Sequence, residues 1–200
     1  MLLVLLTVFE PSAAWNRIAP RGHNPFRVLC FHLLPMLLLG CAAEAYGLVH
    51  WGRPVGEADA RQTYELTSVL IYEACYLGAN LLVVLAGALL LRMLADTFQR
   101  RQRLAQALTV SAFGMGPVFL ARVADAFPAI NPWISWAIGA LIMVAVLYQG
   151  LPRVFHLDPA HALGMYMSSA VLMLLLTGMV RVFMLLSAQK TILIVAGKAS

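Results

Sequence analysis

Long apolar runs separated by short polar stretches dominate the chain. An α-helix rises about 1.5 Å per residue, so a run of about 20 residues crosses the roughly 30 Å of hydrocarbon in a bilayer. Five runs reach that length: Val28–Trp51, Leu66–Leu94, Leu104–Ala126, Ile130–Gly150 and Ala162–Ala188. A lone strand in lipid would leave backbone groups unpaired, and the alternation typical of a barrel is missing. The pattern therefore predicts an all-α fold, an integral membrane bundle of five transmembrane helices.

Two flanking segments complete the predicted organisation. Residues 1–27 are expected to form an N-terminal cytoplasmic or interfacial segment, residues 28–188 the transmembrane domain, and residues 189–200 a C-terminal tail. The first segment opens on the apolar run MLLVLLTVF with no basic residue before it, so we do not expect it to be a cleaved signal peptide. With Trp15 close to Arg17, it is expected to lie along the headgroup layer.

The stretch LYQGLPRVFHLDPAHALGMY, residues 147–166, interrupts the apolar pattern between the last two predicted spans. Gly150 is expected to end the fourth helix in the left-handed conformation, with Pro152 following it. Asp158 can cap the fifth helix, and Pro159 fits its first turn, where a missing N–H costs nothing. The stretch is therefore predicted to be a tight cytoplasmic hairpin.

Composition agrees with a membrane protein. Apolar residues make up 62% of the chain, charged residues 12%, and the mean hydropathy is +0.82. Such a chain cannot cover its surface with polar groups, so the lipid bilayer is its first expected partner. The net charge of +5 is not gathered on a soluble basic face, and no nucleic acid is expected to bind. The three cysteines have no metal-ligand spacing and are expected to pack as small apolar residues.

The positive charges are distributed unequally between the two sides of the predicted bundle. With the N-terminus in the cytoplasm, eight basic residues lie on the cytoplasmic side and five on the opposite side. The cytoplasmic set is Arg17, Arg21, Arg27, Arg92, Arg100, Arg101, Arg103 and Arg153, and the opposite set is Arg53, Arg61, Arg122, Lys190 and Lys198. Because cytoplasmic loops carry the excess of Lys and Arg, we expect a cytoplasmic N-terminus and an outside C-terminus.

Four ionisable residues are predicted to meet inside the bundle. Glu44, Glu73 and Arg181 each lie seven positions from the outer end of their span, about 10 Å deep by helical rise, and Arg122 lies nearer the interface on the same side. Lone ionised groups cost several kcal/mol at such depths, so we expect both acids to pair with Arg181 and also with Arg122. Two interpretations of this intramembrane charge cluster are open. It either does no more than fix the packing of the helices, or it binds a proton, a cation or a lipid phosphate.

Further polar residues admit two interpretations each. Tyr76, Asn80 and Gly87 share a helix face with Glu73 and are expected to mediate close helix contact rather than to line a polar path. The basic residues Arg100, Arg101 and Arg103 beside the membrane are expected to anchor the topology at anionic headgroups, and a docking patch for an acidic partner is the alternative. His156, Asp158 and His161 have a spacing that could ligate a metal, but a solvated hairpin is preferred and no metal site is predicted.

Several short motifs resemble the prokaryotic branch of the Yip family of Ypt-interacting membrane proteins. They comprise Tyr148, Gly150, Leu151 and Pro152 in the hairpin, Pro11, Trp15 and Ile18 near the N-terminus, and Pro117 in the third span. The resemblance covers nearly the whole chain. It implies a multi-pass protein of the bacterial inner membrane with five helices, a cytosolic N-terminus and no assigned catalysis. The long cytosolic region and the DLYGP-type signature of the eukaryotic members, which bind prenylated Rab GTPases, are missing here.

No enzyme motif is present: the chain has no H-E-x-x-H, G-x-S-x-G or P-loop sequence. We therefore expect a non-enzymatic protein without a cofactor. Its expected role is membrane organisation or assembly through helix contacts and a basic cytoplasmic face, with a membrane-protein partner or a second copy of the chain. The alternative is a small transporter or lipid-handling protein that uses the charge cluster.

Overall fold

The structure, a computed structural model, describes residues 6, 10–18, 24–55, 60–98, 103–156 and 159–196. In chain order the elements are α2 (Pro11–Ile18), α3 (Pro25–Val28), the π-helical turn η1 (Leu29–Leu33), α4 (Leu34–His50), β1 (Arg53–Val55), β2 (Ala60–Gln62), α5 (Leu66–Thr97), α6 (Leu104–Gly114), α7 (Gly116–Ala121), the 3-10 turn η2 (Arg122–Ala126), α8 (Pro132–Phe155) and α9 (Pro159–Ala196).

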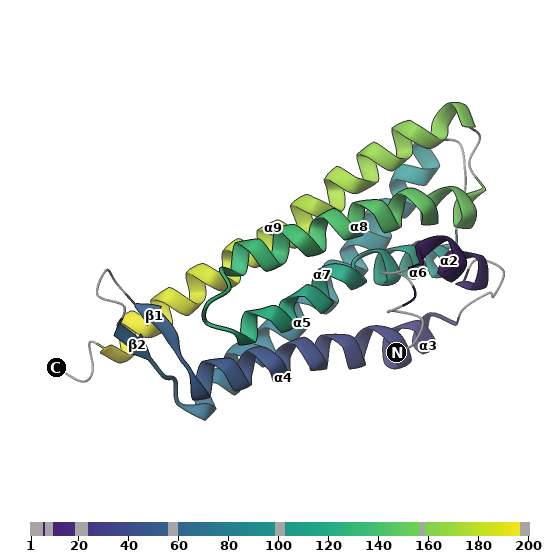
Figure 1. Ribbon diagram of the computed structural model, residues 1–200. Helices are drawn as coiled ribbons and strands as arrows, with labels where there is room; N and C mark the ends of the chain where they lie inside the picture. The colour runs from purple at the N-terminus through teal and green to yellow at the C-terminus, as the bar shows by residue number, and fades with distance from the viewer. Residues whose placement is uncertain are drawn as a thin grey trace.

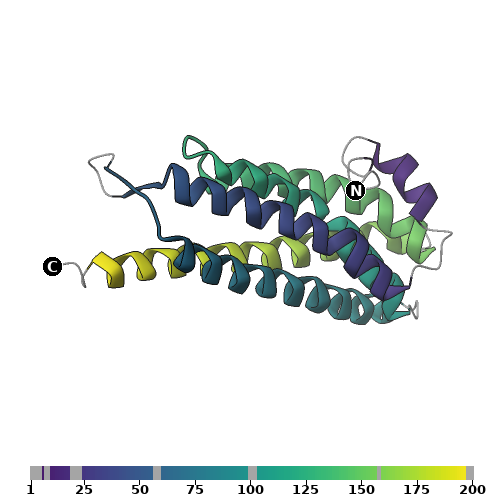
Figure 2. The same cartoon turned by 90° about the horizontal axis from the view of Figure 1, so that it is seen from below.

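Five helical segments of the described chain are long and apolar enough to cross a membrane, which confirms the predicted number. They are Pro25–His50, Leu66–Thr97, Leu104–Ala126, Pro132–Phe155 and His161–Ser187. Figures 1 and 2 show them side by side, with the antiparallel strand pair β1–β2 at one end of the bundle and α2 at the other. We call the end with the β1–β2 hairpin the hairpin end, and the opposite end, where α8 ends and α9 begins, the α2 end.

Two prolines change the course of the helices. Pro35 has no N–H to donate to the carbonyl of residue 31, and the turn before it is π-helical. Pro117 follows the break at Met115 that separates α6 from α7. The third span thus consists of α6, α7 and, at the hairpin end, the tighter 3-10 turn η2. This turn carries Arg122 and Asp125.

The predicted end of the fourth helix at Gly150 is wrong. Helix α8 continues through Pro152 to Phe155, and His156 takes the left-handed conformation with φ 47°. Gly150 is needed for packing instead, because a Cβ at this position would meet the indole ring of Trp15. The predicted cap by Asp158 lies outside the described residues.

Trp15 also lies differently from the prediction. Its side chain is 0% exposed and points into the bundle rather than into the headgroup layer. The indole Nε1 donates to the carbonyl of Val146 at 3.0 Å, and the ring meets Phe113 edge-on with 6.2 Å between centroids. A buried Trp normally has such a hydrogen-bond partner. Helix α2 therefore closes its end of the bundle, with Ala14 and Ile18 also buried.

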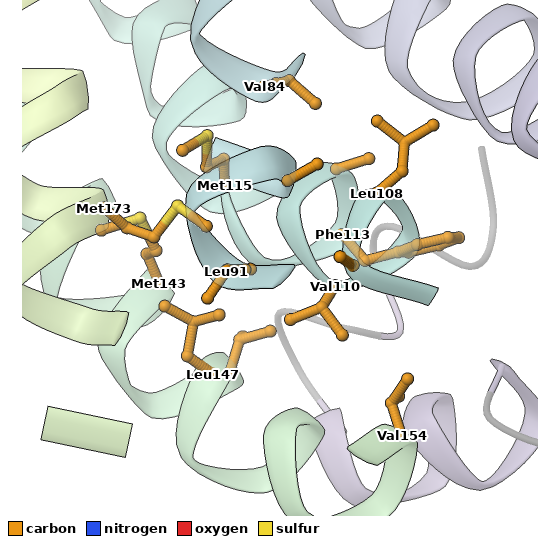
Figure 3. Close-up of a cluster of buried hydrophobic side chains, with 14 of the residues drawn as sticks. Val84, Leu91, Leu108, Val110, Phe113, Met115, Met143, Leu147, Val154 and Met173 are labelled. Atoms are coloured by element: carbon orange, nitrogen blue, oxygen red, sulfur yellow. The ribbon is translucent and has the colours of Figure 1, made fainter. Parts of the chain in front are cut away.

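The interior has an apolar half toward the α2 end. Each of the helices α2 to α9 contributes side chains to it. Figure 3 shows Val84, Leu91, Leu108, Val110, Phe113, Met115, Met143, Leu147, Val154 and Met173. These apolar side chains pack closely against one another, and the buried charged side chains lie in the other half of the bundle.

Candidate functional site

The buried charged side chains gather in the half of the bundle toward the hairpin end. They are Glu44 on α4, Glu73 on α5, Arg122 and Asp125 on η2, and Arg181 on α9. Each is at most 8% exposed. Charges so far from water are tolerated when they pair with one another, and the structure pairs all five.

Arg122 holds the two glutamates. Its Nε donates to Glu44 Oε2 at 2.7 Å, and its Nη2 donates to Glu73 Oε2. The guanidinium carbon lies 3.6 Å from the centroid of the Tyr76 ring, and Nη1 lies 3.1 Å from the Sγ of Cys41. One side chain from η2 therefore joins α4 to α5 by charge-assisted hydrogen bonds and a cation–π contact.

Arg181 makes a second centre. Its Nη2 donates to Asp125 Oδ2 at 2.6 Å and to the carbonyl of Pro132 at 2.6 Å, and its Nη1 donates to the Tyr76 hydroxyl at 3.2 Å. Ser135 on α8 donates to the same aspartate. This centre joins α9, η2 and α8, and Tyr76 connects it to Arg122.

Arg53 completes the set from outside the spans. Gly52 has φ 66°, a conformation that favours glycine, and it turns the chain after α4 so that Arg53 returns to donate to Glu44. Burial alone would lower the pKa of the Arg53 guanidinium, but Glu44, Tyr72 and Asp125 together outweigh it and the pKa is raised. We call Glu44, Glu73, Asp125, Arg53, Arg122 and Arg181 the ionic network; with every member ionised, its three acids balance its three arginines.

The structure brings the four predicted cluster residues into this one network but pairs them differently. Sequence depth predicted Arg181, together with Arg122, as the partners of both glutamates; in the structure Arg122 pairs with both and Arg181 pairs with Asp125 instead. Asp125 and Arg53 were missed. Asp125 could have been found, because it lies three residues after Arg122 and shares its helix face. Arg53 depends on the turn at Gly52, which hydropathy does not show.

Close helix contacts surround the network. A Cβ at Gly47 would collide with the backbone of Ala126, and one at Gly139 would lie 2.8 Å from the Cα of Val118. Small residues of this kind allow helices in a membrane to approach one another. On the predicted face of α5, Asn80 donates to the carbonyl of Tyr76 at 2.8 Å. Gly87 lies on the same face and packs against α6. A Cβ at this position would lie 2.9 Å from the hydroxyl oxygen of Ser111.

Two cavities adjoin the network within the bundle and at its hairpin end. One of about 20 Å³ lies among Asn80, Arg122, Trp136 and Arg181, which is room for about one water. Arg181 and Trp136 line this cavity, and the Arg181 Nε and the Trp136 Nε1 have no partner among the described residues. The other, of about 540 Å³, opens at the hairpin end and reaches Asp125 and Arg53.

The remaining predicted residues lie at the α2 end. Leu151 is fully buried, whereas Tyr148 is exposed and meets Tyr166 edge-on with 5.1 Å between ring centroids. Arg103 is exposed, and its backbone N–H donates to Gln106 Oε1 at 3.1 Å. Arg100 and Arg101 lie outside the described residues. In the described part of the chain, no three His, Cys, Asp or Glu side chains converge as metal ligands would.

This arrangement was compared with known proteins. The model of the Yip1 domain family matches residues 5–182, which is most of the chain. The chain belongs to the Yip family. Membership confirms the resemblance to the Yip family seen in the sequence, without deciding its branch, and makes this Yip protein a multi-pass membrane protein. The comparisons with curated proteins and with solved structures found no match.

The two glutamates are expected to respond differently to loss of charge. Glu44 accepts from both Arg122 and Arg53, whereas Glu73 accepts from Arg122 alone and its Oε1 has no partner in the described chain. Glu44→Gln should therefore lower the free energy of unfolding by about 2 to 3 kcal/mol and Glu73→Gln by about half as much. Unfolding followed by circular dichroism in mixed micelles measures both. A larger loss for Glu73→Gln would show that the hydrogen bonds described here do not rank the two sites.

Proposed function

We propose that this Yip family member is a non-enzymatic membrane organiser that assembles with a membrane protein through its lipid-facing helix surfaces and its basic end. The ionic network then serves to hold the helices together. The observation that carries the proposal is mutual compensation: six charges from α4, β1, α5, η2 and α9 pair with one another. The cavity inside the bundle beside two of them, Arg122 and Arg181, has a volume of about 20 Å³. Ligand pockets have volumes of about 300 to 1,000 Å³.

The outer surface offers contact area instead. Large apolar side chains are exposed on three helices, for example Leu82 on α5, Leu141 on α8 and Met179 on α9, each more than two-thirds exposed. These surfaces face lipid in the free protein, and a partner helix could cover any one of them. At the α2 end, Arg17, Arg27, Arg92 and Arg103 are exposed as well.

We propose that the protein lies in a bacterial inner membrane, with this basic end on the cytoplasmic side and with the hairpin end and the C-terminus on the outer side. Cytoplasmic loops carry the excess of Lys and Arg, which supports this orientation. The basic end can also bind anionic headgroups at about 1 kcal/mol per residue, or an acidic partner.

A small transporter or lipid-handling protein is the second candidate. It is favoured by the cavity of about 540 Å³ at the hairpin end, which reaches Asp125 of the network. In that role the Asp125–Arg181 pair would have to open to admit a substrate deeper into the bundle.

Photo-crosslinking in native membranes separates the two. A photoreactive phenylalanine derivative is placed singly at Leu82, Leu141 and Met179, so that each of three helix surfaces acts as the control for the others. We expect a discrete protein adduct from one surface, weakened when Arg100, Arg101 and Arg103 are all changed to Gln. Lipid adducts alone from all three surfaces would contradict assembly and favour the second candidate.

A further inference from the structure

A groove on the lateral face of the bundle borders the ionic network at Arg53. It has a volume of about 400 Å³ and lies between α5 and α9. Arg53 and Tyr64 line the part nearest the hairpin end. The pair Arg53 and Tyr64 also borders the cavity at the hairpin end. The groove therefore extends from the end of the bundle into the membrane-facing surface.

Polarity changes along this groove. Tyr64 lies just before α5, and Ser68 and Tyr72, four residues apart, lie one turn from each other at the start of that helix; all three line the groove. Cys75, Met184 and Phe183 lie on the groove deeper in the span. Three residues of α5 cover about 5 Å, so the polar part and the apolar part are within the length of one amphiphile.

Hydrogen-bond donors at the polar part remain available. Arg53 has five N–H donors, and Nη2 is engaged by Glu44, while the side chain is 20% exposed. The Tyr64 hydroxyl is buried and has no hydrogen-bond partner among the described residues. Burial raises the pKa of this phenol, more than the nearby Arg53 lowers it, so the hydroxyl keeps its proton and can donate. Buried polar groups normally have a partner, and Tyr64 lines a groove that could hold one.

We infer that this groove binds one glycerophospholipid, with the phosphate at Arg53 and Tyr64 and an acyl chain between α5 and α9. A guanidinium fork matches phosphate oxygens, and the phenol supplies a further donor beside it. Exposed apolar surface at Ile71 and Phe183 borders the chain. The inference is independent of the assembly role, because the lipid would bind the free protein.

The test uses Tyr64→Phe. Changing Arg53 would also remove one of the two cations that Glu44 binds, whereas the Tyr64 hydroxyl has no partner to lose within the described chain. Purified protein is titrated with palmitoyl-oleoyl phosphatidylglycerol, and binding is read by native mass spectrometry. We expect one tightly held lipid and a Kd raised about three- to tenfold by Tyr64→Phe, the effect of one hydrogen bond. Tyr46→Phe, the same change at an exposed position outside the groove, should leave the Kd unchanged.

Two further probes separate the headgroup from the chains. Palmitoyl-oleoyl glycerol has the chains without the phosphate, and glycerol phosphate has the phosphate without the chains; each should bind more weakly than the whole lipid. Bound phosphatidylglycerol should also slow alkylation of Cys75, which lines the groove, relative to Cys30, which does not. Equal affinity for the lipid with and without its phosphate, or no effect of Tyr64→Phe, would overturn the inference.

Discussion

Replacing Arg122 with Met is expected to lower the free energy of unfolding by about 3 to 5 kcal/mol. The change leaves Glu44 and Glu73 buried with their shared cation gone, and breaking a buried ion pair from one side costs about this much. Unfolding in mixed micelles, followed by circular dichroism, measures the loss. Arg103→Met is the matched control: this arginine is exposed, and its loss should change stability by less than about 0.5 kcal/mol. Similar stabilities for the two variants would show that the buried arginine does not compensate the acids.

Trp15→Ala should have an effect of comparable size for a different reason. The indole is fully buried at the α2 end, and truncating a buried Trp costs about 3 to 5 kcal/mol through lost contacts and the cavity left behind. The hydrogen bond to Val146 is lost as well. Protease cleavage near α2 should become faster, because the helix loses the side chain that fastens it to α8. Wild-type stability and cleavage rates would contradict the docking of α2.

Gly150→Ala tests the same contact from the other side. An added methyl group would overlap the Trp15 ring, so this variant should be destabilised although Ala is the better helix former. Gly78→Ala is the control, because nothing lies within 4 Å of a Cβ at that position. It should be neutral or stabilising by up to about 1 kcal/mol. If both variants gain stability, Gly150 does not owe its place to Trp15.

Hydropathy predicted the spans well because a membrane imposes one rule, length and apolarity, on every crossing helix. The end of α8 was mispredicted because two local signals pointed to Gly150: a glycine and a nearby proline usually mark a helix end. Tertiary packing outweighed them, since by continuing to Phe155 the helix buries Leu151, Val154 and Phe155. The family motif has a physical meaning: Trp15 and Gly150 are two halves of one contact.

The site was predictable in depth and not in direction. Counting residues from the span ends placed Glu44, Glu73 and Arg181 at one level, because helical rise is constant. It could not say which helices are neighbours, and this decides that Arg122 reaches both glutamates while Arg181 turns to Asp125. The groove between α5 and α9 was missed entirely, because it depends on these two helices lying side by side.

The most direct test of the central claim, that the buried charges serve one another and the packing of the helices, is the stability of a triple variant. Arg122→Met is combined with Glu44→Leu and Glu73→Leu, which turns the centre of the network apolar while Arg53 stays partly exposed to solvent. Apolar replacement of a whole buried ionic group is often neutral or stabilising, whereas removal of one member is not. The triple variant should therefore recover to within about 1 kcal/mol of the wild-type free energy of unfolding. A triple variant no more stable than Arg122→Met alone would contradict the claim.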